Sequence, residues 1–151
     1  MLGPLFDTVG RRPMIALTYS MSALLLAATG VLFLHDIISA AGQTALWCAI
    51  FFFASAAASS AYLTASEVFP LEIRALAIAI FFAVGTGTGG VMAPWLFGTL
   101  IGTGSRSAVF YGYLAGAALM LIAVAAVLAY GVRAERKSLE EVAPPLSADV
   151  L

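Results

Sequence analysis

The stretch ALAIAIFFAVGTGTGGVMAPWLFGTLI, residues 75–101, contains no charged residue. A transmembrane helix needs about 20 mostly apolar residues, so this stretch is long enough to cross a bilayer. Within it, the segment VGTGTGGVMAP (84–94) carries four glycines and a proline. Glycine lets neighbouring helices approach closely, and proline frees a backbone carbonyl that another group must satisfy. Interrupted helices of this kind occur near the binding sites of transporters, although a simple packing face explains the pattern equally well.

Three other stretches share this lack of charge. The chain has 151 residues, of which 62% are hydrophobic and only 10% charged, whereas a soluble domain carries about 25% charged residues. Four buried helices of a soluble protein would need polar faces, and these stretches have none. The sequence therefore predicts an all-α polytopic membrane protein: a four-helix transmembrane segment over residues 1–134, with spans at about 13–34, 44–65, 75–101 and 108–131, and a cytoplasmic tail over 135–151.

The placement of lysine and arginine predicts the orientation in the membrane. Six of the seven basic residues fall at the two ends of the chain or in the central loop 66–74: Arg11, Arg12, Arg74, Arg133, Arg136 and Lys137. The other two loops, 35–44 and 102–107, hold only Arg106. Because basic residues stay on the cytoplasmic side, we expect a multi-pass protein of the cell membrane with both termini in the cytoplasm.

The residues that catalysis would require are scarce. The single histidine, His35, is in a predicted loop, and the single cysteine, Cys48, lies within the second span and reads as a small core residue. The sequence contains no metal-ligand cluster, no phosphate-binding loop and no basic patch for nucleic acid. We therefore expect neither an enzyme nor a nucleic-acid-binding protein, and no metal or other cofactor.

Three motifs resemble signatures of the major facilitator superfamily, in the version found in sugar porters. The first, GPLFDTVGRR (3–12), resembles the G-x-L-x-D-x-x-G-R-R loop through Gly3, Leu5, Asp7, Gly10, Arg11 and Arg12. The second, EVFPLEIR (67–74), resembles E-x-F-P-x-x-x-R, and ERKSLEEV (135–142) resembles the segment after the last helix. The order of the motifs and the number of spans between them resemble helices nine to twelve of a twelve-helix transporter.

This resemblance implies a function and missing partners. It implies transport of a small organic solute, such as a sugar or an organic acid, by alternating access, and a chain that begins just after a missing eighth helix. The second span lacks the family's P-x-P-W signature, so the resemblance does not single out a hexose. Coupling to protons stays open, because no predicted span contains a carboxylate. Expected partners are the solute, the lipid bilayer and the remaining helices of the transporter.

The resemblance also implies roles for particular residues. Charged pairs at the cytoplasmic helix ends hold the gate shut in this superfamily, which implies a network of Asp7, Arg11, Arg12, Glu67, Arg74 and Glu140. Orientation signals alone would explain the arginines, but not the acidic residues or the spacing between Glu67 and Arg74.

Three aromatic residues are candidates for contact with the solute. Tyr62 falls where the tryptophan of the P-x-P-W signature would lie, and Phe81 and Phe82 lie one to two turns into the third span. Contact with lipid or with the protein core is an equally good interpretation of these three.

Two hypotheses compete with the transporter fragment. One is an independent four-helix transporter that dimerises, which usually needs an intramembrane glutamate that is absent here. The other is a non-transporting membrane subunit or an inactive truncated product. If the chain is a fragment, its small-residue faces at 54–61 and 85–90 should lack helices to pack against.

Overall fold

The structure is a computed structural model that describes residues 9–131, apart from the side chains of residues 65–67. This part of the chain forms four α-helices and contains no strand. The helices are α2 (Arg11–Leu34), α3 (Ala40–Val68), α4 (Leu71–Gly102) and α5 (Arg106–Tyr130). Each is long and apolar enough to cross a membrane. The predicted fold class is therefore confirmed: the chain is a multi-pass, all-α membrane protein.

The helices extend into segments that the sequence predicts as loops. α3 begins at Ala40 because the side chain of Ser39 caps it, accepting a hydrogen bond of 3.2 Å from the amide of Gly42. Ser105 caps α5 in the same way, through a 3.4 Å bond from the amide of Ala108. A side-chain oxygen at this position satisfies a backbone donor that the helix leaves unpaired. These caps lie outside the predicted spans 44–65 and 108–131, so hydropathy alone does not locate the helix ends.

The predicted central loop 66–74 is instead a link of two residues, Phe69 and Pro70, between α3 and α4. Pro70 is the N-cap of α4, and its carbonyl accepts from the amides of Ile73 and Arg74 at 3.2 and 2.9 Å. The predicted loop is wrong here because its charged residues do not interrupt the helices. Proline is well suited to this position, since it ends one helix and its fixed φ suits the start of the next.

Three helices pack around small residues of α2. Thr18, Ser22 and Thr29 are fully buried. The hydroxyls of Thr18 and Thr29 donate to carbonyls one turn earlier in α2, whereas that of Ser22 crosses to the carbonyl of Ile50 in α3 at 3.2 Å. α2 comes close to α5 at Gly30, where an added Cβ would lie 2.9 Å from the Cβ of Tyr113. Small residues of this kind let membrane helices come together in place of the hydrophobic effect.

Hydrogen bonds and an ion pair join the helices at the end where α2 finishes and α5 starts. The Tyr113 hydroxyl is 2.7 Å from the side-chain nitrogen of Gln43, which donates to it from α3. Arg106 forms an ion pair of 2.6 Å with Asp36 and also donates to the carbonyl of Phe33 at 3.2 Å. The side chains of Arg106 and Asp36 are 47% and 73% exposed. Solvent screening at such exposure limits an ion pair to about 0–1 kcal/mol.

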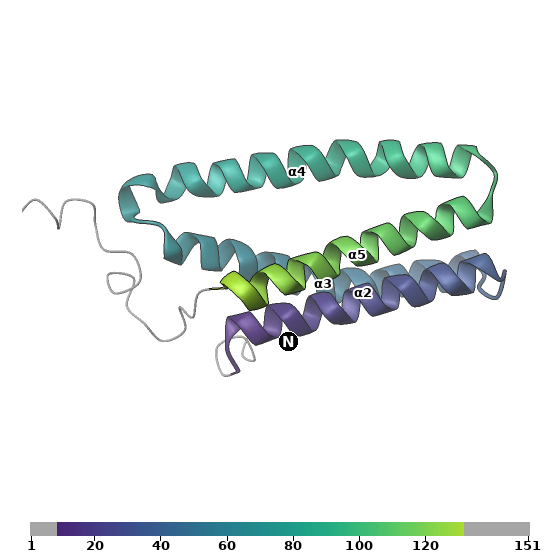
Figure 1. The fold of residues 1–151 in the computed structure, drawn as a ribbon, viewed down its shortest axis with the longest axis horizontal. Coiled ribbons are helices and arrows are strands. Elements are labelled where there is room, and N and C mark those ends of the chain that lie inside the picture. Colours follow the sequence, from purple (N-terminus) through teal and green to yellow (C-terminus); the bar gives the residue numbers. More distant parts are fainter. Residues whose placement is uncertain (1–8, 132–151) are drawn as a thin grey trace, which may run out of the picture.

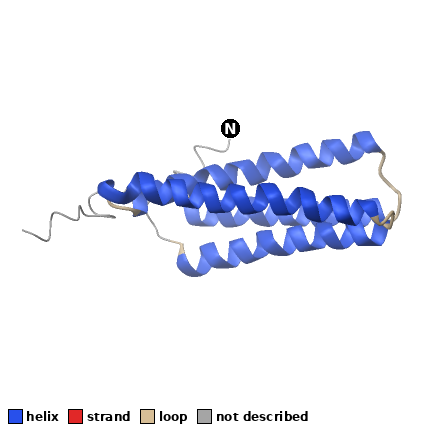
Figure 2. Cartoon of the chain, turned by 90° about the horizontal axis from the view of Figure 1, so that it is seen from above, coloured by secondary structure: helices blue, strands red, loops and turns tan. Residues whose placement is uncertain are grey.

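Helix α4 stands apart from α2, α3 and α5 along most of its length (Figure 1). The axes of all four helices are roughly parallel (Figure 2). Nevertheless, no residue of α4 is buried. Pro94 lies inside α4 without ending it. A Cβ placed on Gly85, Gly87, Gly89 or Gly90 would meet no atom of the described chain within 4 Å. The expectation of an uncovered face at 85–90 is therefore confirmed.

The same expectation is wrong for one side of residues 54–61. Ala57 is fully buried and packs in a cluster with Met14 and Ile15 of α2. Ser60, one turn later, is also buried. The small side chains of this segment thus serve the contact between α2 and α3, which the sequence pattern alone does not distinguish from contact with another helix.

Candidate functional site

The described parts of the two charged motifs, residues 9–12 and 67–74, lie at one end of the helix bundle. α2 begins there, α3 ends, α4 begins and α5 ends, as Figure 1 shows. We call this the signature end and define it by residues 10–12, 68–74 and 130–131. The up-and-down order of the helices brings these segments together although they are far apart in the sequence. Basic residues of both motifs therefore lie on the same side of the membrane protein.

Two arginines of the predicted gate network bind backbone carbonyls. Arg12 donates through a terminal nitrogen to the carbonyl of Leu128 in α5. Its Nε is buried and has no hydrogen-bond partner among the described residues. Arg74 donates through Nε to the carbonyl of Phe69 at 3.2 Å, across the link between α3 and α4. Arg11 is the first residue of α2. The basic half of the predicted network is thus gathered at the signature end.

The acidic half of that network is not described. Asp7 and Glu140 lie outside the described residues, and so does the side chain of Glu67, whose backbone belongs to the last turn of α3. Pairing between these carboxylates and the arginines therefore stays a prediction.

A cavity of about 520 Å³ opens at the signature end. This volume falls within the range of small-molecule sites, about 300–1,000 Å³. All four helices contribute to the walls, which are mainly aromatic and aliphatic: Arg12, Ile15, Tyr19, Ala58, Ala61, Tyr62, Thr64, Val68, Phe69, Phe81, Val127, Tyr130 and Gly131.

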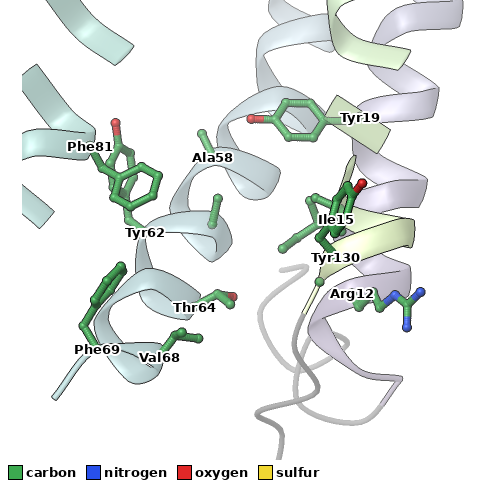
Figure 3. Close-up of a pocket in the computed structure, with 13 residues that line it drawn as sticks. Arg12, Ile15, Tyr19, Ala58, Tyr62, Thr64, Val68, Phe69, Phe81 and Tyr130 are labelled. Atoms are coloured by element: carbon green, nitrogen blue, oxygen red, sulfur yellow. The ribbon is translucent and has the colours of Figure 1, made fainter. Parts of the chain in front are cut away.

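The predicted solute-contacting residues lie together beside this cavity. Tyr62 and Phe81 line it and stand on the same side in Figure 3. Phe82 does not line it, but its ring centroid lies 6.0 Å from that of Tyr62. Phe69 supports the same wall, since its ring lies 6.3 Å from that of Phe81. The structure therefore brings the three candidates to one place, and their contact with a solute stays a prediction.

Sequence reasoning missed three aromatic residues of the cavity: Tyr19, Phe69 and Tyr130. Tyr19 faces Tyr62 and Phe81 from the opposite side, with Ala58 between them (Figure 3). A signal for Tyr19 was present, because Arg12, Ile15 and Tyr19 are spaced i, i+3 and i+7, which puts them on one face of a helix. No comparable signal exists for Tyr130, whose place depends on how α5 packs on α2.

The described residues offer little for metal or acid–base chemistry. They contain no group of three or more histidine, cysteine or carboxylate residues that could hold a metal ion. The cavity can supply ring surfaces, the hydroxyls of its tyrosines and, at Arg12, one charged side chain. Such walls can bind a small molecule and do not by themselves suggest a reaction.

Comparison with known proteins supplies the family. Residues 2–144 match the model of the family described as "Sugar (and other) transporter". The chain belongs to this family. The sugar-transporter family is part of the major facilitator superfamily, so the resemblance of the three motifs is confirmed. Neither the curated proteins nor the solved structures contain a match to this family member. Its membership makes it a transporter-family protein in the membrane, with a small-molecule solute and lipid as partners.

Proposed function

We propose that this chain supplies helices nine to twelve of a secondary transporter, which moves a small organic solute such as a sugar or an organic acid by alternating access. The uncovered face of α4 carries the main support. Glycines at 85, 87, 89 and 90 have no neighbour in the described chain, although small residues in membrane helices usually mark contacts with other helices. Helices beyond these four would cover that face and complete a path for the solute.

The signature end gives a second line of support, as the cytoplasmic gate. The buried Nε of Arg12 has no described partner, and an unpaired charged donor away from water is strongly unfavourable. A carboxylate from the predicted network (Asp7, Glu67 or Glu140) would satisfy it. Partly desolvated pairs of this kind are worth about a few kcal/mol, more than the 0–1 kcal/mol of exposed pairs. Their breakage would couple the gate to the motion between the two halves.

Proton coupling would depend on residues outside the four predicted spans. None of the predicted spans contains an aspartate or a glutamate, and intramembrane proton carriers are usually such ionisable residues. We therefore assign the four helices to the walls and the gate of the transporter.

The direct test is transport by the 151-residue chain alone. We expect the chain to insert into liposomes but to give no saturable uptake of radiolabelled glucose, citrate, 4-hydroxybenzoate or the uncharged 4-hydroxybenzamide. Four helices supply only part of one wall, and the face at 85–90 is left to lipid. In a second preparation, the chain is reconstituted together with the first eight helices of a sugar porter, and uptake of the same solutes is measured.

The outcomes separate the three hypotheses. Uptake that appears only with the added helices supports the fragment. Saturable uptake by the chain alone overturns it in favour of a dimeric four-helix transporter, and no uptake in either preparation favours a non-transporting subunit or an inactive product.

We further propose that both termini, and with them the signature end, face the cytoplasm of the cell. Six basic residues at the chain ends and in the central loop, against one in the other two loops, support this orientation. Alkaline phosphatase fused after Ala134 should be inactive, because it would stay in the cytoplasm, whereas a fusion between residues 36 and 42 should be active. The opposite pattern of activities would reverse the assignment of the gate to the cytoplasmic side.

A further inference from the structure

We infer that the cavity at the signature end binds an uncharged aromatic ring of the solute rather than a hexose. The inference rests on the proposed function, because it takes the bound molecule to be the transported one. It names the chemical class of that solute, which neither the family nor the motifs decide. It follows from what the walls of the cavity contain and from what they lack.

The walls present ring faces and edges on two sides. Tyr62 and Phe81 come from α3 and α4, and Tyr19 faces them from α2 (Figure 3). Their packing on neighbours holds the first two in place: Tyr62 is inclined at 44° to the ring of Phe82, and Phe81 at 58° to that of Phe69. Aromatic pairs prefer such tilted or offset arrangements, with centroids about 4.5–7 Å apart. A ring placed between these walls would find the same geometry.

Small residues leave room between the two sides. Ala58 and Ala61 line the cavity from α3, and Ala58 lies between Tyr19 and Tyr62 in Figure 3. A volume of about 520 Å³ is ample for a substituted benzene ring. Lining of this kind, mostly apolar with a few polar groups, is typical of small-molecule sites.

The polar groups are too few for a hexose. The cavity offers the hydroxyls of Tyr19, Tyr62 and Tyr130, while the hydroxyl of Thr64 already donates to the carbonyl of Ser60 at 2.9 Å. A hexose that lies against these aromatic and aliphatic walls would exchange hydrogen bonds to water on that face for apolar contacts, and the hydroxyls on that face would lack partners, which is unfavourable. An aromatic compound with one or two polar substituents matches the three tyrosine hydroxyls.

The charged group of the cavity does not favour an ionised ring substituent. Arg12 lines the cavity, but its guanidinium points away from Tyr62 and Phe81 in Figure 3. A terminal nitrogen of this guanidinium donates to the carbonyl of Leu128. Arg12 therefore borders the cavity chiefly with its methylene chain, and the space between the tyrosines lacks a described charge.

The experiment measures binding to the whole 151-residue chain in lipid nanodiscs by saturation-transfer difference NMR. The probes are 4-hydroxybenzamide, which is uncharged and aromatic, and D-glucose. We expect saturable transfer to the ring protons of 4-hydroxybenzamide and none to D-glucose. Empty nanodiscs measure the partition of the probe into lipid, and this background is subtracted.

Variants locate the binding. Tyr62→Leu and Tyr19→Leu should each weaken the binding of 4-hydroxybenzamide about tenfold, because each removes one ring from the site. The matched control is Tyr111→Leu, which removes a 66% exposed tyrosine of α5 outside the cavity and should leave binding unchanged. Phe81→Leu, on α4, tests the wall that Phe81 shares with Tyr62 should a variant of α2 or α3 fail to fold, as judged by circular dichroism.

Each outcome decides the inference. Equal loss in Tyr62→Leu and Tyr111→Leu, or no binding above that of empty nanodiscs, overturns it. Binding of D-glucose that Tyr62→Leu abolishes also overturns it, yet leaves the proposed transport function intact. Failure of transport in the co-reconstituted liposomes, with aromatic binding retained, would instead remove the proposed function and leave an aromatic-binding membrane protein.

Discussion

Replacing Gly30 with leucine should destabilise the bundle more than the same substitution at the uncovered glycines of α4. A Cβ at Gly30 would lie 2.9 Å from the Cβ of Tyr113 and 3.3 Å from the ring of Phe110. Both Cβ atoms are fixed to helix backbones, so α2 and α5 would have to separate. Overpacking of this kind costs about 1–3 kcal/mol, and we expect the upper end because the contact is between backbones. Thermal unfolding of the detergent-solubilised chain, followed by circular dichroism, measures the loss.

The matched control for this prediction is Gly85→Leu. It makes the same change within a helix, at a position where an added Cβ meets nothing within 4 Å of the described chain. Leucine is the better helix former by about 0.8 kcal/mol, so the midpoint of unfolding should stay the same or rise slightly. Equal destabilisation by the two substitutions would contradict the close approach of α2 and α5.

Removing the charge of Arg74 or Glu67 should reduce transport about tenfold or more in a complete twelve-helix transporter built around this chain. A partly desolvated gate pair that loses one partner leaves the other charge poorly compensated, and a tenfold change corresponds to about 1.4 kcal/mol. Initial uptake rates of Arg74→Ala and Glu67→Gln, normalised to the amount of protein in the membrane, measure the effect. Arg74→Lys retains the charge and should lose less.

Arg106→Ala supplies the comparison at the opposite end of the bundle. This substitution breaks the pair of Arg106 with Asp36, whose side chains are 47% and 73% exposed. We expect a change of less than about threefold, in keeping with the small worth of exposed pairs. If Arg74→Ala and Arg106→Ala reduce uptake equally, loss of a positive charge at either end of the bundle lowers transport to the same extent. That result would contradict a specific role of Arg74 in the gate.

The fold was predictable because a bilayer imposes a length on each span. The charge-free stretches Pro13–Leu34 and Ala75–Ser105 required helices on that ground alone. Their ends were less predictable, since they depend on single side chains such as Ser39 and on the backbone at Pro70. Hydropathy is averaged over a window of many residues, so the effect of one capping residue on a helix end does not appear in it.

The site was predictable where one motif fixed the position of a residue. Arg12, Arg74 and Tyr62 lie in or next to the two charged motifs, and the order of the helices brings those motifs to the same end. Tyr130 was missed because its place in the cavity depends on how the end of α5 packs on the start of α2, where Val127 lies against the cluster of Met14 and Ile15. That contact arises between residues distant in the sequence, and neither motif contains it.

The link of two residues at Phe69–Pro70 bears on how this protein tolerates change in length. Most loops accept an inserted or deleted residue, because they lie on the surface and have slack. This link has none, since α3 ends at Val68 and α4 begins at Leu71. Removal of one residue would leave a single residue between the helices, so α3 or α4 would have to give up part of its end turn. A residue added inside the first turn of α4 would turn the glycines at 85–90 by about 100° relative to the link. We therefore expect this junction to tolerate substitution better than a change in length.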